Sequence, residues 1–309
     1  MIKHYIRIAR PDHWFKNIFM LPGIIMGLYY TNFSLESTTI WILLEGIFAT
    51  CLIASANYVI NEWLDTEFDK YHPVKRNRSS LKADLKRGIV YAEYAFLALA
   101  GLIISYTISI EFLLTEVLFL VMGFLYNVPP FRTKDKAYLD VLSESVNNPI
   151  RFVLGWLLMG IVFFPPSSVL IAYWMGGAFL MAVKRFAEYR YIGDPDRAAL
   201  YRKSFAKYSE ESLFLSAFFY ALMSAVFLGV FLVKYKIEFL LSLPLFAVLF
   251  VWYLHLGMQP HSVSQTPEKL YRQNGFFFFT IMLSVVVMAL FFIDLPWLHV
   301  FVESIVTLG

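Results

Sequence analysis

The stretch from residue 61 to residue 69, Asn-Glu-Trp-Leu-Asp-Thr-Glu-Phe-Asp, places several oxygen-bearing side chains at helical spacing. If one helix runs through it, Asn61, Asp65 and Asp69 stack at intervals of four residues, and Glu62 shares the face of both aspartates. Such carboxylates repel each other unless a cation neutralises them. Magnesium suits this ligand set, because it binds oxygen and joins one or two carboxylates to substrate phosphates. The stretch predicts a magnesium site; the alternative is a solvated acidic helix end.

The residues that follow this stretch are basic. Lys75, Arg76 and Arg78 come soon after a break at Tyr71-His72-Pro73. Ammonium and guanidinium groups bind phosphate oxygens, so the loop and the acidic stretch together predict a diphosphate site. The alternative is that the loop touches anionic lipid.

A second constellation lies farther along the chain. Tyr126 and Lys134 flank a cationic loop that contains two prolines, and Asp140 and Glu144 then share a helix face at a spacing of four. Polar residues continue into the next apolar run as far as Arg151, and polar side chains inside a span usually face a bundle interior or a cavity. With the first stretch, these carboxylates predict a two-magnesium clamp. Taken alone, they fit an acidic helix N-terminus favoured by the helix dipole.

A third basic group ends the apolar run near residues 167–183. It contains Lys184 and Arg185, with Glu188 close behind. We consider the two cations as further phosphate ligands. The alternative is that they are ordinary basic residues at a helix C-terminus.

The sequence lacks the residues that several other kinds of chemistry require. The single cysteine, Cys51, excludes a disulfide framework and a thiolate zinc site. No HExxH, GxGxxG or GxxxxGK[ST] motif occurs, so soluble nucleotide-binding enzymes are excluded as well. We expect no nucleic-acid partner.

The composition indicates that these residues are positioned by a membrane bundle. Hydrophobic residues make up 59% of the 309 and charged residues only 16%, against roughly 25% charged in an average soluble domain. A spanning helix needs about 20 apolar residues. We therefore expect a single all-α domain, residues 1–309, of nine transmembrane helices near residues 15–31, 40–60, 89–109, 111–128, 141–164, 167–183, 212–233, 237–258 and 275–302.

The basic residues orient these spans. With a cytoplasmic N-terminus, nine spans put 23 of the 26 lysines and arginines on the cytoplasmic side, as the positive-inside rule requires. Lys234 and Lys236 fall on the other side, and Arg151 lies within a span. We expect an integral protein of the bacterial inner membrane whose active site faces the cytoplasm. Its oligomeric state stays open.

The two acidic stretches resemble the motifs of the UbiA superfamily of intramembrane prenyltransferases, which has nine helices and binds magnesium and a diphosphate. The family motif NDxxDxxxD reads here as Asn61-Glu62, Asp65 and Asp69, and the second motif, DxxxD, reads as Asp140 and Glu144. The chain looks most like the decaprenyl-phosphate phosphoribosyltransferase branch, on residues that include Arg10-Pro11, Trp14, Lys16, Asn17, His72-Pro73, Lys75-Arg76, Arg78, Arg151, Gly155, Lys184-Arg185, Glu188 and Pro267-Glu268.

The resemblance implies a reaction and roles for these residues. It implies Mg²⁺-dependent transfer of 5-phosphoribosyl from phosphoribosyl pyrophosphate to a polyprenyl phosphate in the membrane. Catalysis would fall to Asp65, Asp69, Asp140 and Glu144, which with Asn61 and Glu62 would hold the metal. Substrate contacts would come from Lys16, Asn17, Lys75, Arg76, Arg78, Tyr126, Lys134, Arg151, Lys184, Arg185 and Glu188.

Two other functions stay open from the sequence. The same metal site fits a prenyltransferase that moves an isoprenyl chain from a prenyl diphosphate to an aromatic acceptor. An acidic cation site in nine spans also fits a transporter. The position of the carboxylates at cytoplasmic helix ends, rather than near the bilayer midplane, counts against a transporter.

Overall fold

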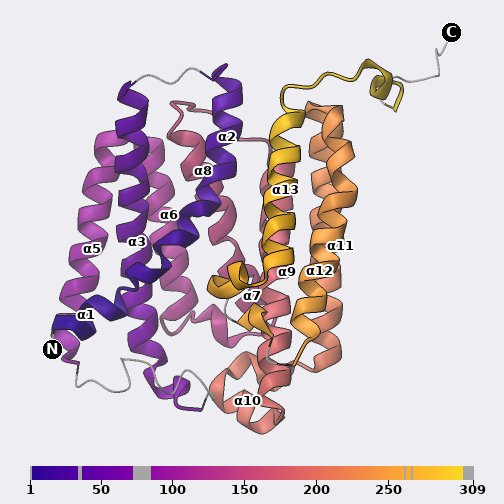
Figure 1. Cartoon of the computed structure of the whole chain (residues 1–309). Coiled ribbons are helices and arrows are strands. Elements are labelled where there is room, and N and C mark those ends of the chain that lie inside the picture. Colours follow the sequence, from indigo (N-terminus) through magenta and orange to yellow (C-terminus); the bar gives the residue numbers. More distant parts are fainter. Residues whose placement is uncertain (1, 34–36, 72–84, 261, 266, 302–309) are drawn as a thin grey trace. The chain divides into compact units, whose positions relative to one another are not determined.

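The structure is a computed structural model, and it describes residues 2–33, 37–71, 85–260, 262–265 and 267–301. Every regular element in these ranges is a helix (Figure 1). The chain forms two compact units, Met1–Pro165 with Ile192–Ser209, and Pro166–Tyr191 with Glu210–Gly309.

The centre of the first unit is a long helix, α3, which spans Ser37–Asp69 and has 33 residues. At 1.5 Å per residue it is about 50 Å long, which exceeds the roughly 30 Å of a hydrocarbon core. It packs against α5 (Arg87–Ile108) and α6 (Ile110–Asn127). The hydroxyl of Ser109 caps α6 by accepting a hydrogen bond from the Phe112 N–H at 3.1 Å. The acidic stretch at residues 61–69 is therefore continuous with the apolar part of α3.

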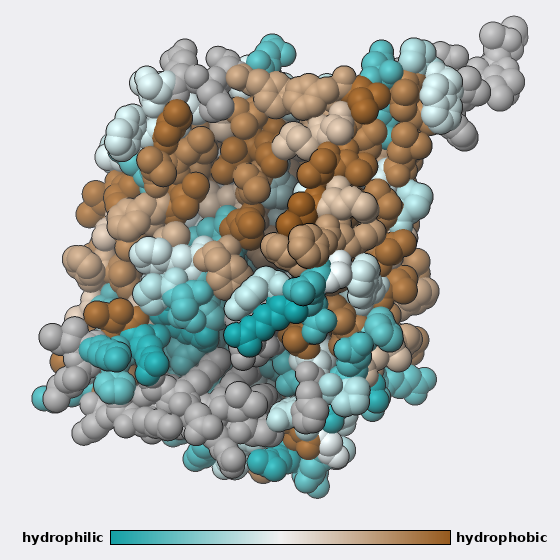
Figure 2. Space-filling view, viewed as in Figure 1, coloured by the Kyte–Doolittle hydropathy of each residue, from teal (hydrophilic) through white to brown (hydrophobic). Residues whose placement is uncertain are grey.

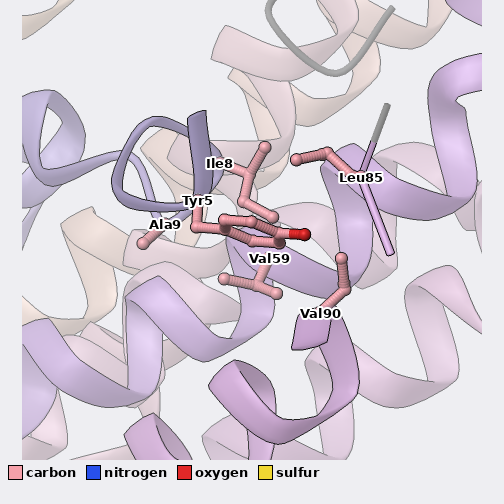
Figure 3. Close-up of a cluster of buried hydrophobic side chains, with 6 residues drawn as sticks. All are labelled: Tyr5, Ile8, Ala9, Val59, Leu85 and Val90. Atoms are coloured by element: carbon pink, nitrogen blue, oxygen red, sulfur yellow. The ribbon is translucent and has the colours of Figure 1, made fainter. Parts of the chain in front are cut away.

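The N-terminal helix α1 (Ile2–Ile8) is held against this bundle by apolar contacts. Figure 3 shows the cluster, which consists of Tyr5, Ile8, Ala9, Val59, Leu85 and Val90. Val59 lies two residues before the acidic stretch of α3. Burial of this cluster thus brings the N-terminal segment beside the first acidic motif.

The predicted span at 15–31 is wrong as a single helix. The segment forms a 3₁₀ helix, η1 (Pro11–Met20), followed by α2 (Leu21–Tyr30). Proline stands in the first turn of each element, where its missing N–H costs nothing. Gly23 packs closely against the helix that contains Phe152, and an added Cβ at Gly23 would be 2.0 Å from the Phe152 carbonyl oxygen.

The predicted span at 141–164 is also interrupted. It consists of α7 (Leu139–Ser145) and α8 (Asn147–Leu157), which meet at Val146. Pro149, which has no N–H to donate, stands in the first turn of α8. Both helices pack against α6, and α8 also packs against η1 and α2. Asp140 and Arg151 are thereby buried in the first unit's interior.

The segment Ile192–Ser209 contributes α10 (Pro195–Tyr201) and η4 (Lys203–Lys207) to the first unit. The second unit consists of α9 (Ser167–Ile192), α11 (Glu210–Tyr235), η5 (Ile237–Ser242), α12 (Leu243–Met258), η6 (Val263–Gln265), η7 (Pro267–Arg272), α13 (Asn274–Leu290) and η8 (Pro296–Phe301). The predicted span at 275–302 is too long, because α13 ends at Leu290.

Six helices of the described residues are long and apolar enough to cross a membrane: Ser37–Asp69, Arg87–Ile108, Ile110–Asn127, Ser167–Ile192, Glu210–Tyr235 and Ile237–Met258. Figure 2 shows hydrophobic side chains over the sides of the helices, with polar ones gathered toward α10. The protein is an all-helical integral membrane protein. Nine spans, a cytoplasmic N-terminus and one domain over 1–309 stay predictions.

Candidate functional site

The first acidic motif lies at the end of α3, where Asp65 binds two cations. Its carboxylate oxygen accepts hydrogen bonds from Arg132 Nη2 at 3.0 Å and Lys134 Nζ at 2.5 Å. Both cations come from the loop after α6, and only 9% of Arg132 and 3% of Lys134 is exposed. Asp65, a predicted metal ligand, and Lys134, a predicted phosphate ligand, therefore form an ion pair in which the lysine is buried and the aspartate is partly buried.

Asn127, at the C-terminal end of α6, holds this loop to α3. Its side-chain oxygen accepts from Asn61 Nδ2 at 2.5 Å and from Lys134 Nζ at 2.8 Å, while its backbone carbonyl accepts from Arg132 Nη1 at 3.0 Å. The amide of Asn127 therefore fixes both cations relative to the acidic motif.

Glu62 and Asp69 complete the first motif. The buried carboxylate of Glu62 accepts a hydrogen bond from Arg10 Nη1 at 3.1 Å. Arg10 follows the α1 cluster of Figure 3, so packing of α1 places this guanidinium. Asp69 is the last residue of α3 and is buried.

The second motif is bound to the segment that contains η4. Asp140 is fully buried, and its two carboxylate oxygens accept from Ser204 Oγ at 3.1 Å and Tyr208 Oη at 2.8 Å. Arg202 Nη1 lies 3.7 Å from the same carboxylate. The hydroxyl of Tyr208 also accepts a hydrogen bond from the backbone N–H of Tyr138 at 2.5 Å.

Tyr126 and Arg202 join the two motifs into one network. The hydroxyl of Tyr126 donates to Glu144 at 2.7 Å and accepts from Arg202 Nη1 at 3.4 Å, and Lys134 Nζ lies 5.6 Å from the Tyr126 ring centre. Arg202 also interacts electrostatically with Asp65. Arg202 therefore links Asp65 of the first motif to Asp140 and, through Tyr126, to Glu144 of the second.

Two features of the loops are typical of a functional site. Burial, followed by the nearby charges of Arg132 and Arg202, lowers the pKa of Lys134 to about 8, although Asp65 opposes the shift. Arg10, Arg132 and Tyr138 adopt positive φ values of 51°, 27° and 66°. Non-glycine residues with such backbone angles store strain and cluster at active sites.

The other predicted substrate residues of the first unit lie near η1. Arg151 Nε donates to Asn17 Oδ1 at 2.9 Å, and its guanidinium lies over the Phe119 ring at 4.6 Å. Lys16 Nζ lies 5.5 Å from the Tyr58 ring centre. Asn17 and Arg151 are therefore partners in the unit's interior.

The remaining predicted residues belong to the second unit or lie outside the described residues. Lys184, Arg185 and Glu188 lie on α9 in the second unit, where buried Arg185 donates to Glu188 at 3.1 Å. The basic loop with Lys75, Arg76 and Arg78 lies outside the described residues. Their roles stay predictions.

Sequence reasoning assigned no site role to a set of residues that pair with the predicted carboxylates or orient their partners: Arg10, Asn127, Arg132, Arg202, Ser204 and Tyr208. Among these, Arg10 entered the sequence analysis only as part of the family resemblance. Arg132 carried a signal, because it stands within the cationic loop of the second constellation. Ser204 and Tyr208 carried none, since they follow Asp140 by more than 60 residues without a recognisable spacing.

The donor chemistry fits magnesium. No group of three or more His, Cys, Asp or Glu side chains stands close enough to hold a metal ion among the residues that the structure describes. Magnesium needs only one or two carboxylates when phosphates and water complete its shell, and Asp65 and Asn61 offer oxygen donors at one site. Asp65 is paired with Arg132 and Lys134, so a metal ion bound to its carboxylate would replace these ion pairs.

The chain matches the model of the UbiA prenyltransferase family over residues 20–282. A decaprenyl-phosphate phosphoribosyltransferase from Mycolicibacterium smegmatis is 25% identical over 69% of this chain, which spans 65% of that relative's length. One from Mycobacterium tuberculosis is 25% identical over 69% of this chain and 68% of its own.

Solved structures share the fold. A UbiA homolog from Archaeoglobus fulgidus bound to GPP and Mg²⁺ superposes with a TM-score of 0.67 at 16% identity, over 94% of this chain and 98% of its own. The resemblance drawn from the two acidic motifs is confirmed. The chain belongs to the UbiA prenyltransferase family.

Proposed function

We propose that this protein transfers a 5-phosphoribosyl group from phosphoribosyl pyrophosphate to a long-chain polyprenyl phosphate, with magnesium, at the cytoplasmic face of the membrane. The observation that carries the proposal is the network of Asp65, Asp140 and Glu144 with Arg132, Lys134 and Arg202. Carboxylates interleaved with cations bind metal and phosphate together. The decaprenyl-phosphate phosphoribosyltransferases named above support the choice of donor and acceptor.

The reaction replaces one bond at the anomeric carbon of the ribose. The bond from that carbon to the pyrophosphate oxygen breaks, and pyrophosphate leaves with the electron pair, while an oxygen of the lipid phosphate forms the new bond. Arg132 and Lys134 would bind the departing pyrophosphate, and Asp65, Asn127 and Tyr126 would hold these cations in place. Asn61, Glu62, Asp65, Asp69, Asp140 and Glu144 are the residues proposed to hold magnesium, which would supply further stabilisation of the developing negative charge.

The acceptor explains both the membrane location and the lack of a strong base. A polyprenyl phosphate is already anionic, so its oxygen attacks without losing a proton to the protein. Its isoprenoid tail would leave the bilayer only at a large hydrophobic cost. We propose that this tail lies against apolar helix surfaces and that the sugar donor enters from the cytoplasm.

A prenyltransferase is the second candidate. It is favoured by the solved UbiA homologs from Archaeoglobus fulgidus, which are bound to GPP or DMAPP with Mg²⁺. The same cations would then bind the diphosphate of an allylic donor, and an aromatic ring would accept the prenyl group. This reaction requires an apolar channel beside the network, whereas a phosphoribosyl donor requires an additional phosphate subsite.

One assay separates these functions. Purified full-length protein in detergent is offered labelled phosphoribosyl pyrophosphate with polyprenyl phosphate, or a prenyl diphosphate with aromatic acids, each with magnesium or EDTA. We expect a magnesium-dependent product from the first mixture. Product from only the second mixture would contradict the proposal and support the prenyltransferase. Turnover in EDTA would contradict the role of the carboxylates as metal ligands.

A further inference from the structure

A pocket of about 530 Å³ opens in the first unit beside the network but apart from its carboxylates. It lies where the loop after η3 (Thr133–Asp135) faces the end of η4, and it is lined by Asp135, Lys136, Ala137, Tyr138 and Lys207. Neither the acidic motifs nor the family comparison assigns these residues a role.

The pocket carries positive charge. The exposed side chains of Lys136 and Lys207 form no hydrogen bond or ion pair with any other described side chain. The one acid in the lining, Asp135, is already neutralised by Arg132 Nε at 3.2 Å and Lys203 Nζ at 3.6 Å. Two ammonium groups are therefore available to an anion.

Both walls of the pocket connect to the network within the first unit. Asp135 binds Arg132, which in turn binds Asp65 of the first motif. The backbone N–H of Tyr138 donates to Tyr208, whose hydroxyl donates to Asp140 of the second motif. An anion in the pocket would thus lie beside the proposed pyrophosphate ligands, separated from them by single side chains.

Tyr138, which lines this pocket, has a strained backbone. Its φ of 66° is unusual for a residue with a side chain, and the ring packs edge-on against Tyr208 with centroids 5.2 Å apart. Tyr138 lines the same pocket as the two lysines, and its phenol hydroxyl is a hydrogen-bond donor. Two ammonium groups and a phenol hydroxyl are the kinds of donor that bind the oxygens of a phosphate monoester.

We propose that the pocket is a second phosphate subsite, formed by Lys136, Lys207 and Tyr138, which binds the phosphate monoester at the far end of a phosphorylated sugar donor. The identity of that donor rests on the proposed function. A prenyl diphosphate carries no phosphate monoester apart from its diphosphate, so the pocket would have no role in prenyl transfer. A lipid headgroup phosphate offers the same chemistry and is separated by the experiment.

The test compares the full-length wild type with the double variant Lys136→Gln/Lys207→Gln. We expect the KM for phosphoribosyl pyrophosphate to rise about 10- to 100-fold, since two charge-assisted contacts are lost. Inhibition by ribose 5-phosphate should weaken equally, and inhibition by inorganic pyrophosphate should not change. The charge-preserving variant Lys136→Arg/Lys207→Arg should restore most of the affinity. Lys234→Gln, at the end of α11, is the matched control and should behave as the wild type.

Three results would overturn the proposal. The first is an unchanged KM and unchanged ribose 5-phosphate inhibition in the double variant. The second is an equal loss of pyrophosphate inhibition, which would show a general change of the site. The third is an altered response to anionic lipid in nanodiscs with normal ribose 5-phosphate inhibition, which would assign the pocket to a headgroup.

A binding measurement tests the pocket even if the proposed function is wrong. If the wild type forms no phosphoribosyl product, direct binding of labelled ribose 5-phosphate to the wild type and the double variant still tests the pocket. Binding that depends on Lys136 and Lys207 would support the subsite even then. Equal binding to both proteins, or none to either, would reject it.

Discussion

Asp65 balances the charges of two buried cations as well as being a proposed metal ligand. Arg132 and Lys134 both bind its carboxylate. Removing one partner of a buried ion pair leaves an uncompensated charge, which typically costs 3–5 kcal/mol. Loss of activity and loss of stability are therefore linked at this residue.

The variant Asp65→Asn tests this link, because it keeps the shape and removes the charge. We expect kcat to fall roughly 10²- to 10³-fold and the thermal unfolding midpoint in detergent to fall as well. Glu67→Gln, on an exposed side chain of the same turn, is the control and should alter neither. A variant that is inactive but as stable as the wild type would show that Asp65 does not stabilise the buried cations.

His13 provides a prediction for the effect of pH on stability. Its ring is buried and faces Tyr58 of α3 at 5.2 Å. Burial, with Lys16 and Arg10 nearby, lowers its pKa to about 3, against the opposing effect of Asp12. The unfolded chain binds a proton below about pH 6.5 and the folded chain does not, so the free energy of unfolding falls as pH falls from 6.5 toward 3.

Between pH 6.5 and pH 3, His13 alone lowers the free energy of unfolding by up to about 1.4 kcal/mol for each pH unit. His13→Gln should therefore lose less stability than the wild type between pH 7 and pH 5, measured by thermal unfolding in detergent. His255→Gln, at an exposed position on α12, should follow the wild type. Parallel curves for all three proteins would contradict a neutral, buried His13.

At the scale of elements, close packing of η1 and α2 against α8 positions Arg151. An added Cβ at Gly155 would lie 2.1 Å from the Met20 carbonyl oxygen. One turn earlier on the same helix, Arg151 reaches Asn17 of η1. A methyl group at residue 155 must push the two elements apart and lengthen this hydrogen bond.

Gly155→Ala should therefore lower the free energy of unfolding by about 1–3 kcal/mol, as overpacking does. Gly229→Ala on α11 is the matched control, because nothing lies within 4 Å of its added Cβ, and alanine favours a helix by up to about 1 kcal/mol. Thermal unfolding of both variants in the same detergent measures the difference. Equal midpoints would mean that α8 can move away from η1 freely.

Periodicity and apolar length predicted some elements better than others. The second predicted span extends through the acidic stretch as α3, because that stretch has no proline or glycine. The first and fifth predicted spans are broken, although hydropathy alone reads each as continuous. Their breaks depend on Pro22 and Pro149 and on close packing between η1, α2 and α8, and tertiary packing is not visible to a hydropathy count.

At the scale of the whole molecule, the sequence predicts which side of the membrane each loop occupies. Lys70, at the end of α3, should face the cytoplasm, and Lys234, at the end of α11, should face the opposite side. Lys70→Cys and Lys234→Cys are made in a Cys51→Ala background, since Cys51 is the single cysteine. A membrane-impermeant maleimide should label only Lys234→Cys in intact cells and both variants in lysed cells. Labelling of Lys70→Cys in intact cells would reverse the orientation.

The candidate site is only partly predictable for a reason of chain topology. Carboxylates at helical spacing are local features, so Asp65 and Asp140 stand out in the sequence. Their hydrogen-bond partners come from distant segments: Arg132 follows Asp65 by 67 positions, and Tyr208 follows Asp140 by 68. No local pattern predicts these pairs, because the fold alone brings the segments together.

The attachment of Asp140 to Ser204 and Tyr208 sets an order of events during synthesis. The ribosome completes α7 long before these two partners, and all of α9 must be made and inserted between them. Chains grow at about 5–20 residues per second, so Asp140 waits for several seconds without its two hydroxyl donors. The nascent protein therefore gains its assembled second motif only after residue 208 has emerged, and a chain released before that point has both acidic motifs but no finished site.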